Sequence, residues 1–290
     1  MKLCVIGGAG ARSAFLTKSL VKSARDIRVD HIVLLDNDQQ KLKTYGEISR
    51  ELARRLDPEL TFEVTSDARA ALTGVDYIIT TIRAGGDAGR LFDEQTCLAH
   101  GVLGQETTGA GGFAMAIRSV PTLVYYCTLA REVANPGHLI FNFTNPSGII
   151  TQALRSKGFD NVYGICDAPS GFIKQLEEIL DIPYGTLDIE CYGLNHLSWF
   201  RNAKVNGRDV QRELLDNPRT YEHSEMRLFT REMARISGDC MLNEYLYFYY
   251  RRVKSLSMIQ KADHPRGEMI YLINRELEEQ LARQAPLSTE

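Results

Sequence analysis

Short apolar runs alternate with helical patterns along the first part of the chain. Residues 2–6 form an apolar run that ends in a glycine turn, and residues 31–35 form a second run closed by an acidic residue. Such alternation is typical of a parallel sheet with helices on both faces. We therefore predict an α/β fold with a doubly wound, Rossmann-like parallel sheet. Further strands are predicted at residues 61–65, 77–82, 139–143 and 162–165, and helices at 13–22, 39–56 and 114–133.

The pattern changes after about residue 170. Two longer runs, 187–192 and 197–205, read as strands, and the following Asn206-Gly207 is a strong hairpin signal. From about residue 224 onward the pattern is mainly helical. We predict two domains, an α/β domain at residues 1–168 and an α+β domain at residues 169–290.

Composition and charge narrow the class of protein. The chain has 290 residues, of which 44% are hydrophobic, and a formal net charge of −3, so no basic field predicts a nucleic-acid partner. The N-terminal apolar run is far too short for a signal peptide or a membrane span. Six scattered cysteines at 4, 97, 127, 166, 191 and 240 do not form a disulfide pattern. We expect a cytoplasmic protein without a membrane partner.

The glycine turn after the first strand is typical of a dinucleotide site. Gly7, Gly8 and Gly10 leave room for backbone N–H groups and a helix N-terminus to approach a pyrophosphate, although Ser13 replaces the last glycine of the pattern. Asp36 ends the second strand, where a carboxylate accepts from a ribose and repels a 2′-phosphate. We predict that these residues bind NAD in preference to NADP. The alternative is a tight turn followed by a helix-capping aspartate.

Polar residues follow the strand predicted at residues 139–143. Asn145 comes directly before Pro146 and a predicted helix. Because ligands of doubly wound sheets bind at the carboxyl edge of the strands, Asn145 is a candidate binding residue. A plain helix cap explains the same pattern equally well.

Cys166 and His196 form a candidate metal pair. A thiolate and an imidazole suit a transition metal, and two protein ligands leave positions open for substrate oxygens and water. Taken separately, a cysteine near a strand end is usually a core residue and a lone histidine is usually structural. Spacing alone does not separate these readings.

Two further segments contain candidate binding residues. Arg83 and Arg90 flank a glycine bend after the fourth strand, where guanidinium groups could bind a phosphate, although two solvated arginines are the simpler reading. Residues 104–112 are glycine-rich and polar, as in a loop that lies over a ligand. Residues 245–250 are mostly tyrosines, and most of these are expected in the core or at an interface.

Together, these segments resemble glycoside hydrolase family 4, the NAD- and manganese-dependent glycosidases that include 6-phospho-glucosidases. The motifs occur in the family's order and cover nearly the whole chain. The layout also resembles lactate and malate dehydrogenases, whose fold the family shares. The matching segments are Ile6-Gly7-Gly8, Asp93-Glu94, Gly104-Gln105-Glu106-Thr107, Asn142-Phe143-Thr144-Asn145-Pro146, Gly164-Ile165-Cys166-Asp167-Ala168-Pro169, Gly193-Leu194-Asn195-His196 and Asn243-Glu244-Tyr245-Leu246.

The resemblance implies hydrolysis of a glycosidic bond by a redox route. NAD takes a hydride from C3 of the sugar, and the resulting ketone acidifies the proton on C2, which a base removes. The C1 substituent is then eliminated, water adds to the alkene, and the hydride returns. This class is an exception to the mechanism that uses two carboxylates, and the chain shows no obvious carboxylate pair.

The resemblance also implies a role for each matching residue. Cys166 and His196 would bind Mn²⁺, which also holds the C2 and C3 oxygens of the sugar. Tyr245 would be the base at C2. Asp167 would act as the acid on the leaving oxygen, and an aspartate at this position leans towards the 6-phospho-α-glucosidases. The residues implied to contact the substrate are Arg83 and Arg90 at the 6-phosphate, and Asn145, Asp167 and Asn195 at the sugar.

The resemblance makes residues 1–168 an NAD-binding domain and residues 169–290 a substrate and metal domain. Family members are usually longer than this chain, so we expect the second domain to be truncated and to lack the family's C-terminal part. We also expect a homo-oligomer, either a dimer or a tetramer, that binds a phosphorylated glycoside. Two alternatives stay open, namely an NAD-dependent dehydrogenase of a small hydroxy acid and a non-catalytic protein that binds NAD or a sugar phosphate.

Overall fold

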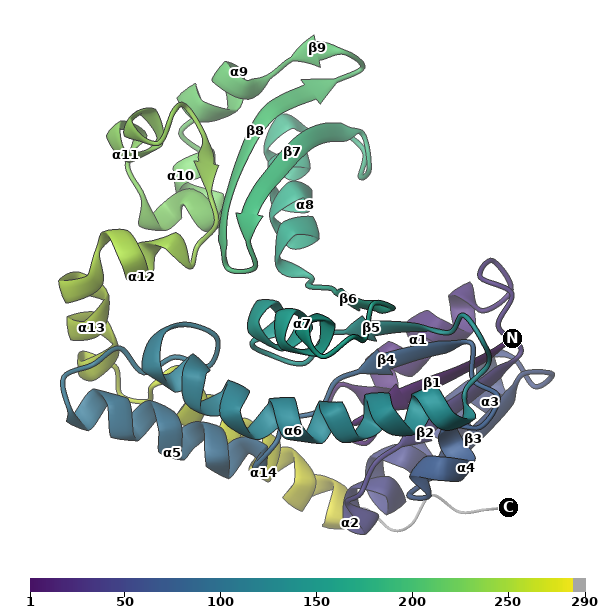
Figure 1. The fold of residues 1–290 in the computed structure, drawn as a ribbon. Helices are drawn as coiled ribbons and strands as arrows, with labels where there is room; N and C mark the ends of the chain where they lie inside the picture. Colours follow the sequence, from purple (N-terminus) through teal and green to yellow (C-terminus); the bar gives the residue numbers. More distant parts are fainter. Residues whose placement is uncertain (284–290) are drawn as a thin grey trace. The chain divides into compact units, whose positions relative to one another are not determined.

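The computed structural model describes residues 1–283, which divide into two compact units (Figure 1). Unit 1 contains residues 1–97, 104–165 and 263–283 of the described chain. Unit 2 contains residues 98–103 and 166–262. Each unit has its own hydrophobic core and is described by itself.

Unit 1 is built on a six-stranded parallel sheet in the order β3-β2-β1-β4-β5-β6 (Figure 1). This is the strand order of the dinucleotide-binding fold, and it confirms the predicted doubly wound class. The predicted strands are all present, although the fourth is two residues shorter than its apolar run. The strands are β1 (Lys2–Ile6), β2 (His31–Leu35), β3 (Thr61–Thr65), β4 (Tyr77–Thr80), β5 (Leu139–Asn142) and β6 (Val162–Gly164).

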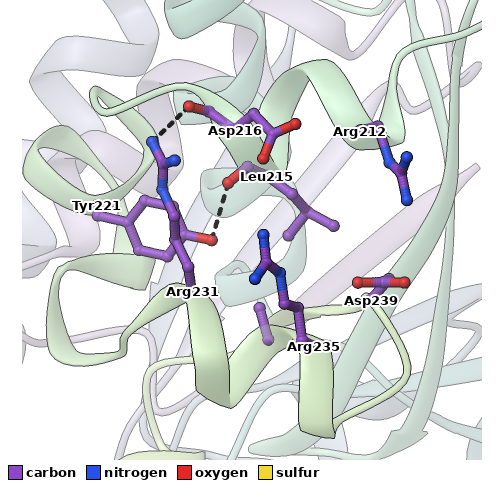
Figure 2. Close-up of a pocket in the computed structure, with 8 residues that line it drawn as sticks. Arg212, Leu215, Asp216, Tyr221, Arg231, Arg235 and Asp239 are labelled. Carbon is purple, nitrogen blue, oxygen red and sulfur yellow. Dashed lines mark hydrogen bonds between the residues drawn. The ribbon is translucent and has the colours of Figure 1, made fainter.

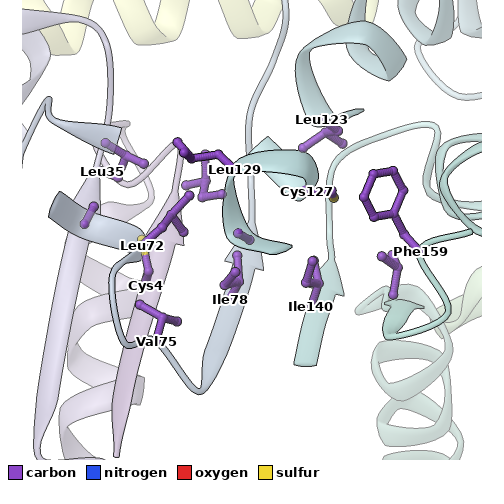
Figure 3. Packing of buried hydrophobic residues seen from close by; sticks show 14 of the residues in the cluster. Cys4, Leu35, Leu72, Val75, Ile78, Leu123, Cys127, Leu129, Ile140 and Phe159 are labelled. Carbon is purple, nitrogen blue, oxygen red and sulfur yellow. The ribbon is translucent and has the colours of Figure 1, made fainter. Parts of the chain in front are cut away.

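The central strand β1 is buried on both faces of the sheet, and the alternation of its side chains shows how. Cys4 points into a cluster that includes Ile78 and Ile140 of other strands and Leu123 and Cys127 of the long helix α6 (Gly109–Val133) (Figure 3). Its neighbours Leu3 and Val5 belong to a second cluster on the opposite face. Strands that are apolar on both sides read as continuous hydrophobic runs, which explains the sequence pattern.

The helices of unit 1 follow the prediction in type but differ in their bounds. The helix expected at residues 39–56 is interrupted by a π-helical turn, η1 (Leu42–Gly46). Helix α6 is long and apolar enough to cross a membrane by length and composition alone, but several of its apolar side chains pack into the core described above. The helices are α1 (Ser13–Ser23), α2 (Gln39–Lys41), α3 (Glu47–Leu56), α4 (Ala68–Leu72), α5 (Gly86–Ala99), α6 (Gly109–Val133), α7 (Ser147–Ser156) and α14 (Arg266–Arg283).

The predicted glycine-rich loop at residues 104–112 is partly helical, because α6 begins at Gly109. A Cβ atom at Gly111 would lie 2.7 Å from the carbonyl oxygen of Gln105, and one at Gly112 would lie 2.6 Å from the carbonyl carbon of Thr107. The glycines therefore allow the first turn of α6 to pack directly against the segment before it.

The last described helix, α14, belongs to unit 1, which differs from the predicted boundary between residues 168 and 169. The buried carboxylate of Glu94 on α5 accepts the backbone N–H of Gly267 at 2.8 Å and pairs with Arg90. Asn274 donates to Asp87 on the same helix. These contacts join residues far apart in the chain, so no local pattern could have indicated them. Residues 284–290 of the predicted second domain lie outside the described residues.

Unit 2 is an α+β unit around an antiparallel sheet in the order β10-β8-β7, with β9 paired to β8. The predicted Asn206-Gly207 turn joins β8 to β9, where Val205 pairs with Arg208. Helix α8 packs on the sheet, with the ring of Phe172 4.9 Å from that of Phe200. The elements are α8 (Ala168–Leu180), β7 (Leu187–Leu194), β8 (Leu197–Val205), β9 (Arg208–Asp209), α9 (Gln211–Asp216), α10 (Thr220–His223), η2 (Glu225–Leu228), α11 (Arg231–Ile236), β10 (Met241–Leu242), α12 (Leu246–Tyr250) and α13 (Arg252–Lys261).

Candidate active site

The glycine turn lies between β1 and α1, as a dinucleotide site requires. Gly7 has a φ of +83°, and a Cβ atom there would lie 2.9 Å from the backbone nitrogen of Ile82. Gly8 is equally constrained, with Leu34 2.8 Å from its Cβ position. A Cβ atom at Gly10, by contrast, would meet nothing within 4 Å. Packing therefore explains the first two glycines, whereas Gly10 borders open space where a ligand can approach the backbone.

Asp36 links the end of β2 to the glycine turn. One carboxylate oxygen accepts the N–H of Ala9 at 3.1 Å, and the other accepts the N–H of Asp38 at 3.1 Å. Burial raises the pKa of Asp36, and the backbone hydrogen bonds oppose this effect. The helix-capping role considered for Asp36 belongs to Asp38, which accepts the N–H groups of Gln40 and Lys41. The position of Asp36 thus fits a ribose-binding carboxylate.

Asn145 lies at the carboxyl edge of the same sheet. Its neighbour Asn142 is fully buried and accepts the hydroxyl of Thr80 at 2.8 Å, which joins the ends of β5 and β4. Helix α7 begins two residues after Asn145, and no side chain caps its N-terminus. The alternative of a plain helix cap therefore does not describe Asn145, which is half-buried and available to a ligand.

Arg83 and Arg90 belong to one network of ion pairs. Glu106, from the glycine-rich segment, pairs with Arg83 at 3.1 Å and with Arg90 at 2.9 Å. Arg90 also pairs with Glu94 at 2.8 Å, and its side chain is only 7% exposed. Because buried charges require partners, this placement favours a structural role for Arg90. Arg83, which also pairs with Asp87, is 32% exposed and remains the better candidate for a phosphate.

The two predicted metal ligands lie side by side in unit 2. Cys166 lies two residues before the start of α8, and His196 lies in the turn between β7 and β8. The distance from Cys166 Sγ to His196 Nε2 is 3.9 Å. One ion bound at about 2.3 Å from sulfur and about 2.1 Å from nitrogen reaches both atoms. Within the described part of the chain, no group of three or more histidine, cysteine or acidic side chains could hold a metal ion. The pair therefore leaves coordination positions open.

The backbone at His196 is unusual for a residue with a side chain. His196 has a φ of +59° in a two-residue turn, between the paired residues Leu194 and Leu197, and its side chain is buried. Histidine and asparagine enter this left-handed region more readily than most residues. The other turn residue is Asn195, which is half-buried and next to the metal pair. A tight turn that holds a buried imidazole in this conformation is a constraint often found at functional sites.

Tyr245 completes the cluster. The centroid of its ring lies 3.9 Å from that of His196, with an angle of 57° between the ring planes. Asp167 Oδ1 lies 4.0 Å from Cys166 Sγ. The structure thus brings together four residues to which the sequence assigned metal-binding and catalytic roles.

The sequence did not point to Glu225, a buried carboxyl group that is hydrogen-bonded to the residues just before Tyr245. Glu225 is 6% exposed and accepts hydrogen bonds from Asn243 Nδ2 at 3.1 Å and from the N–H of Glu244 at 2.9 Å. Burial raises the pKa of Glu225 to about 7. A lone glutamate at the start of a short helix has no distinctive sequence signal. Glu106 was similarly missed, although it lies in a motif that resembles the family.

A cavity of about 410 Å³ in unit 2 contains none of the predicted site residues. Three arginines and two aspartates line it, so its charges largely balance. Figure 2 shows that Arg231 donates to the carbonyl oxygen of Asp216, and that the Tyr221 hydroxyl donates to that of Leu215. These hydrogen bonds hold the short helices of unit 2 together. We assign the cavity no part in the candidate site.

A Rossmann-type unit with a nucleotide turn, together with a cysteine–histidine–tyrosine cluster, defines a class of NAD- and metal-dependent proteins. The profile of the family 4 glycosyl hydrolases matches residues 2–182, and that of their C-terminal domain matches residues 191–289. The chain belongs to glycosyl hydrolase family 4. The match over residues 191–289 shows that at least part of the family's C-terminal domain is present.

Curated relatives include enzymes for both anomers. The chain is 34% identical to 6-phospho-beta-glucosidase BglT of Thermotoga maritima over 218 residues, which cover 75% of this chain and 51% of that protein. It is 30% identical to phospho-alpha-glucosidase PagL of Clostridium acetobutylicum over 267 residues, which cover 85% of this chain and 59% of that one. The chain thus spans about half the length of the curated relatives that it matches.

Solved structures agree with these matches. A 6-phospho-beta glucosidase from Thermotoga maritima, determined with manganese, NAD⁺ and glucose-6-phosphate, superimposes with a TM-score of 0.87 at 30% identity, covering 98% of this chain and 67% of that one. A lactate dehydrogenase from Eimeria maxima superimposes with a TM-score of 0.56 at 14% identity, covering 95% of this chain and 75% of that one. This second likeness confirms the shared fold and carries no statement about function.

The raised pKa of Glu225 predicts a specific pH dependence of stability. Below about pH 4.5 the group is protonated in both the folded and the unfolded chain. As the pH rises from there to about 7, only the unfolded chain releases the proton, so the free energy of unfolding falls. The glutamine of Glu225→Gln does not titrate. The free energy of unfolding of this variant, relative to that of the unmodified protein, should therefore rise by about 3 kcal/mol between about pH 4.5 and pH 7.

Urea unfolding of both proteins at a series of pH values between 4 and 8.5 checks this expectation. Glu222→Gln, on an exposed helix of the same unit, is the matched control and should show no comparable trend. A difference in stability between Glu225→Gln and the unmodified protein that does not change with pH would contradict a raised pKa.

Proposed function

We propose that this protein hydrolyses the O-glycosidic bond of 6-phospho-glucosides by an NAD-dependent redox and elimination route assisted by Mn²⁺. The observation that carries this proposal is the convergence of Cys166, His196 and Tyr245 within unit 2 of a family 4 chain. Relatives named for 6-phospho-glucosides, and a similar structure determined with NAD⁺, manganese and glucose-6-phosphate, support the same substrate and cofactors.

The nucleotide would bind at the glycine turn of unit 1. Gly10 borders open space, and Asp36 is held where it can accept hydrogen bonds from the ribose hydroxyls. When bound, NAD supplies a reversible hydride acceptor for C3 of the sugar. The protein's own part is to orient the nucleotide through backbone N–H groups and the Asp36 carboxylate.

The metal would be held by Cys166 Sγ and His196 Nε2. A bound Mn²⁺ supplies positive charge beside the C2 and C3 oxygens of the sugar. The turn at His196 and the N-terminus of α8 at Cys166 hold the two ligand atoms close together without further movement of the backbone. Asn195, in the same turn, is the candidate for a contact with the sugar.

Proton transfer is assigned to two residues of the same cluster. Tyr245 would accept the proton from C2, and its position against the His196 ring places it beside the metal pair. Asp167, which follows Cys166, would protonate the leaving oxygen at C1. An aspartate here supports an α-linked substrate, whereas the relatives include enzymes for both anomers.

Two residues of unit 1 are further candidates for binding a phosphorylated sugar. Arg83 is the candidate for the 6-phosphate because its side chain is partly exposed, and Asn145 is the candidate for a sugar hydroxyl. A simple hydroxy-acid dehydrogenase would not need the cysteine–histidine–tyrosine cluster. A non-catalytic binding protein would retain the same binding residues but show no turnover, so an assay with nitrophenyl 6-phospho-α- and β-glucosides distinguishes it from a glycosidase. A cytoplasmic location and a dimer or tetramer stay predictions.

We expect the Asp36 carboxylate to make the protein prefer NAD to NADP, because it would repel a 2′-phosphate. Isothermal titration calorimetry with both nucleotides measures the preference. Asp36→Asn removes the repulsion and should narrow the ratio of dissociation constants by about tenfold, equivalent to ~1.4 kcal/mol. Tighter binding of NADP than of NAD by the unmodified protein would refute this assignment.

We expect Cys166→Ser and His196→Asn each to weaken Mn²⁺ binding by about 100-fold or more, since each removes one of two ligands. Asparagine suits the left-handed backbone at position 196, so the turn should persist. Electron paramagnetic resonance of free Mn²⁺ measures the affinity, and calorimetry should show nearly unchanged NAD binding. Cys97→Ser, on α5, is the control. Unchanged Mn²⁺ affinity in both ligand variants would exclude this pair as the site.

Hydrolysis in deuterated water should place deuterium at C2 of the product, because the route removes the C2 proton and later replaces it from solvent. Tyr245→Phe keeps the ring but has no proton acceptor, and turnover and exchange should fall by about 100-fold or more. Tyr249→Phe, an exposed tyrosine on α12, is the matched control and should behave like the unmodified protein. Mass spectrometry or NMR of the product detects the deuterium. Hydrolysis that leaves no deuterium at C2 would rule out the redox and elimination route.

A further inference from the structure

We propose that Glu225 is a positioning residue of the active site, whose buried carboxylate holds the Tyr245 ring against His196 through Asn243. The proposal rests on the function proposed above, because it assigns Tyr245 the part of the base. It adds a residue that lies outside every motif by which the chain resembles its family.

A single carboxylate oxygen of Glu225 makes both bonds to the segment that carries Tyr245. Oε2 accepts from Asn243 Nδ2 at 3.1 Å and from the N–H of Glu244 at 2.9 Å. Both donors lie within two residues of Tyr245, and Asn243 is only 1% exposed. If the acceptor is removed, both donors lose their hydrogen-bond partner in a place that is largely shielded from water, so the segment that carries Tyr245 is expected to shift.

Asn243 transmits this constraint to Tyr245. Its Oδ1 accepts the N–H of Tyr245 at 3.1 Å, while its backbone carbonyl accepts the N–H of Leu246 at 3.0 Å at the start of α12. The side-chain amide of Asn243 therefore accepts a hydrogen bond from Tyr245 at its oxygen and donates one to Glu225 from its nitrogen. Such an arrangement defines which way the amide faces, and through it the backbone direction at Tyr245.

The other contacts of this segment lead to the elements that carry the metal pair. The N–H of Glu225 donates to Gln175 on α8, the helix that begins just after Cys166, at 3.0 Å. The N–H of Asn243 donates to the carbonyl oxygen of Ser198 at 3.1 Å, two residues after His196 in β8. Glu225 and Asn243 thus join α8, β8 and the Tyr245 segment into one hydrogen-bonded frame.

The chain offers a matched control for a purely structural effect. Glu177 is 2% exposed, lies in the same unit, and one of its oxygens accepts the N–H groups of Thr186 and Leu187 at 2.9 and 3.0 Å. Glu177 is therefore buried like Glu225 and likewise accepts two N–H groups at one oxygen, but both of its donors are backbone groups at the start of β7 rather than groups next to Tyr245. A general loss of stability should follow substitution at either site, whereas a displaced Tyr245 should follow only at Glu225.

The first measurement is the NMR spectrum of the full chain with ¹³C-labelled tyrosine rings. Tyr245→Phe identifies the Tyr245 signal among the 13 tyrosines. In the unmodified protein this signal should be displaced by the nearby imidazole ring of His196. Glu225→Leu should move or broaden it, while Glu225→Gln, which keeps an acceptor oxygen, and Glu177→Leu should leave it in place. Glu225→Asp withdraws the acceptor by one methylene group and provides a second test if Glu225→Leu does not fold.

The second measurement is turnover of a nitrophenyl 6-phospho-glucoside in the presence of NAD and Mn²⁺. Glu225→Leu should lower kcat by about 10- to 100-fold with a KM within about twofold, because a small displacement of the base affects the reacting geometry. Glu225→Gln should recover most of this loss, and Glu177→Leu should show no selective loss of kcat.

The two measurements separate failure of this inference from failure of the proposed function. If the unmodified chain shows no turnover, the proposed function fails, and the NMR signal still decides whether Glu225 positions Tyr245. The inference is overturned if the Tyr245 signal is unchanged in folded Glu225→Leu and Glu225→Asp, or if Glu177→Leu changes the signal to the same extent.

Discussion

Burial of both faces of the parallel sheet is the constraint on which unit 1 depends. Alternate residues of β1 enter two separate cores, so the interior of this central strand has no room for polar groups. In the central strands, polar side chains are therefore favoured where the strands end, and the parallel arrangement brings those ends to one edge. The glycine turn, Asp36 and Asn145 all lie there, which is why a ligand site at this edge follows from the architecture itself.

In unit 2, the packing of helix α8 on the β7–β8 hairpin brings Cys166 and His196 of the Cys166–His196–Tyr245 cluster together. Phe172 of α8 contacts Phe200 of β8, and this contact brings the segment before the helix close to the turn before the strand. Cys166 and His196 are thus adjacent although 30 positions separate them. The left-handed backbone at His196 and the buried carboxyl group of Glu225 then orient the rings of His196 and Tyr245. Both features, a positive φ at a residue with a side chain and a buried acid, lower the stability of the fold.

Glu106, whose side chain is 11% exposed, and the buried Glu225 illustrate a common way in which largely buried carboxylates act in this protein. Each joins two partners: Glu106 pairs with Arg83 and Arg90, and Glu225 accepts from Asn243 and Glu244. Neither is assigned contact with the substrate. A buried acid needs several donors or cations to remain stable, and this requirement makes it an effective connection between segments that must keep a precise relation.

The sequence by itself determined the class of fold, because apolar runs and helical periods are local properties of the chain. The strand–turn–helix context indicated Gly10 and Asp36, whereas Cys166, His196 and Tyr245 received their roles from the motifs that resemble the family. Only the tertiary structure decided which of the candidates share one place. In the structure, Arg90 is buried in an ion-pair network, and Glu94 binds the first turn of α14, which belongs to unit 1. Glu225 accepts a hydrogen bond from the residue before Tyr245. These outcomes depend on contacts between residues far apart in the chain, and the energy of such contacts leaves no pattern in the local sequence.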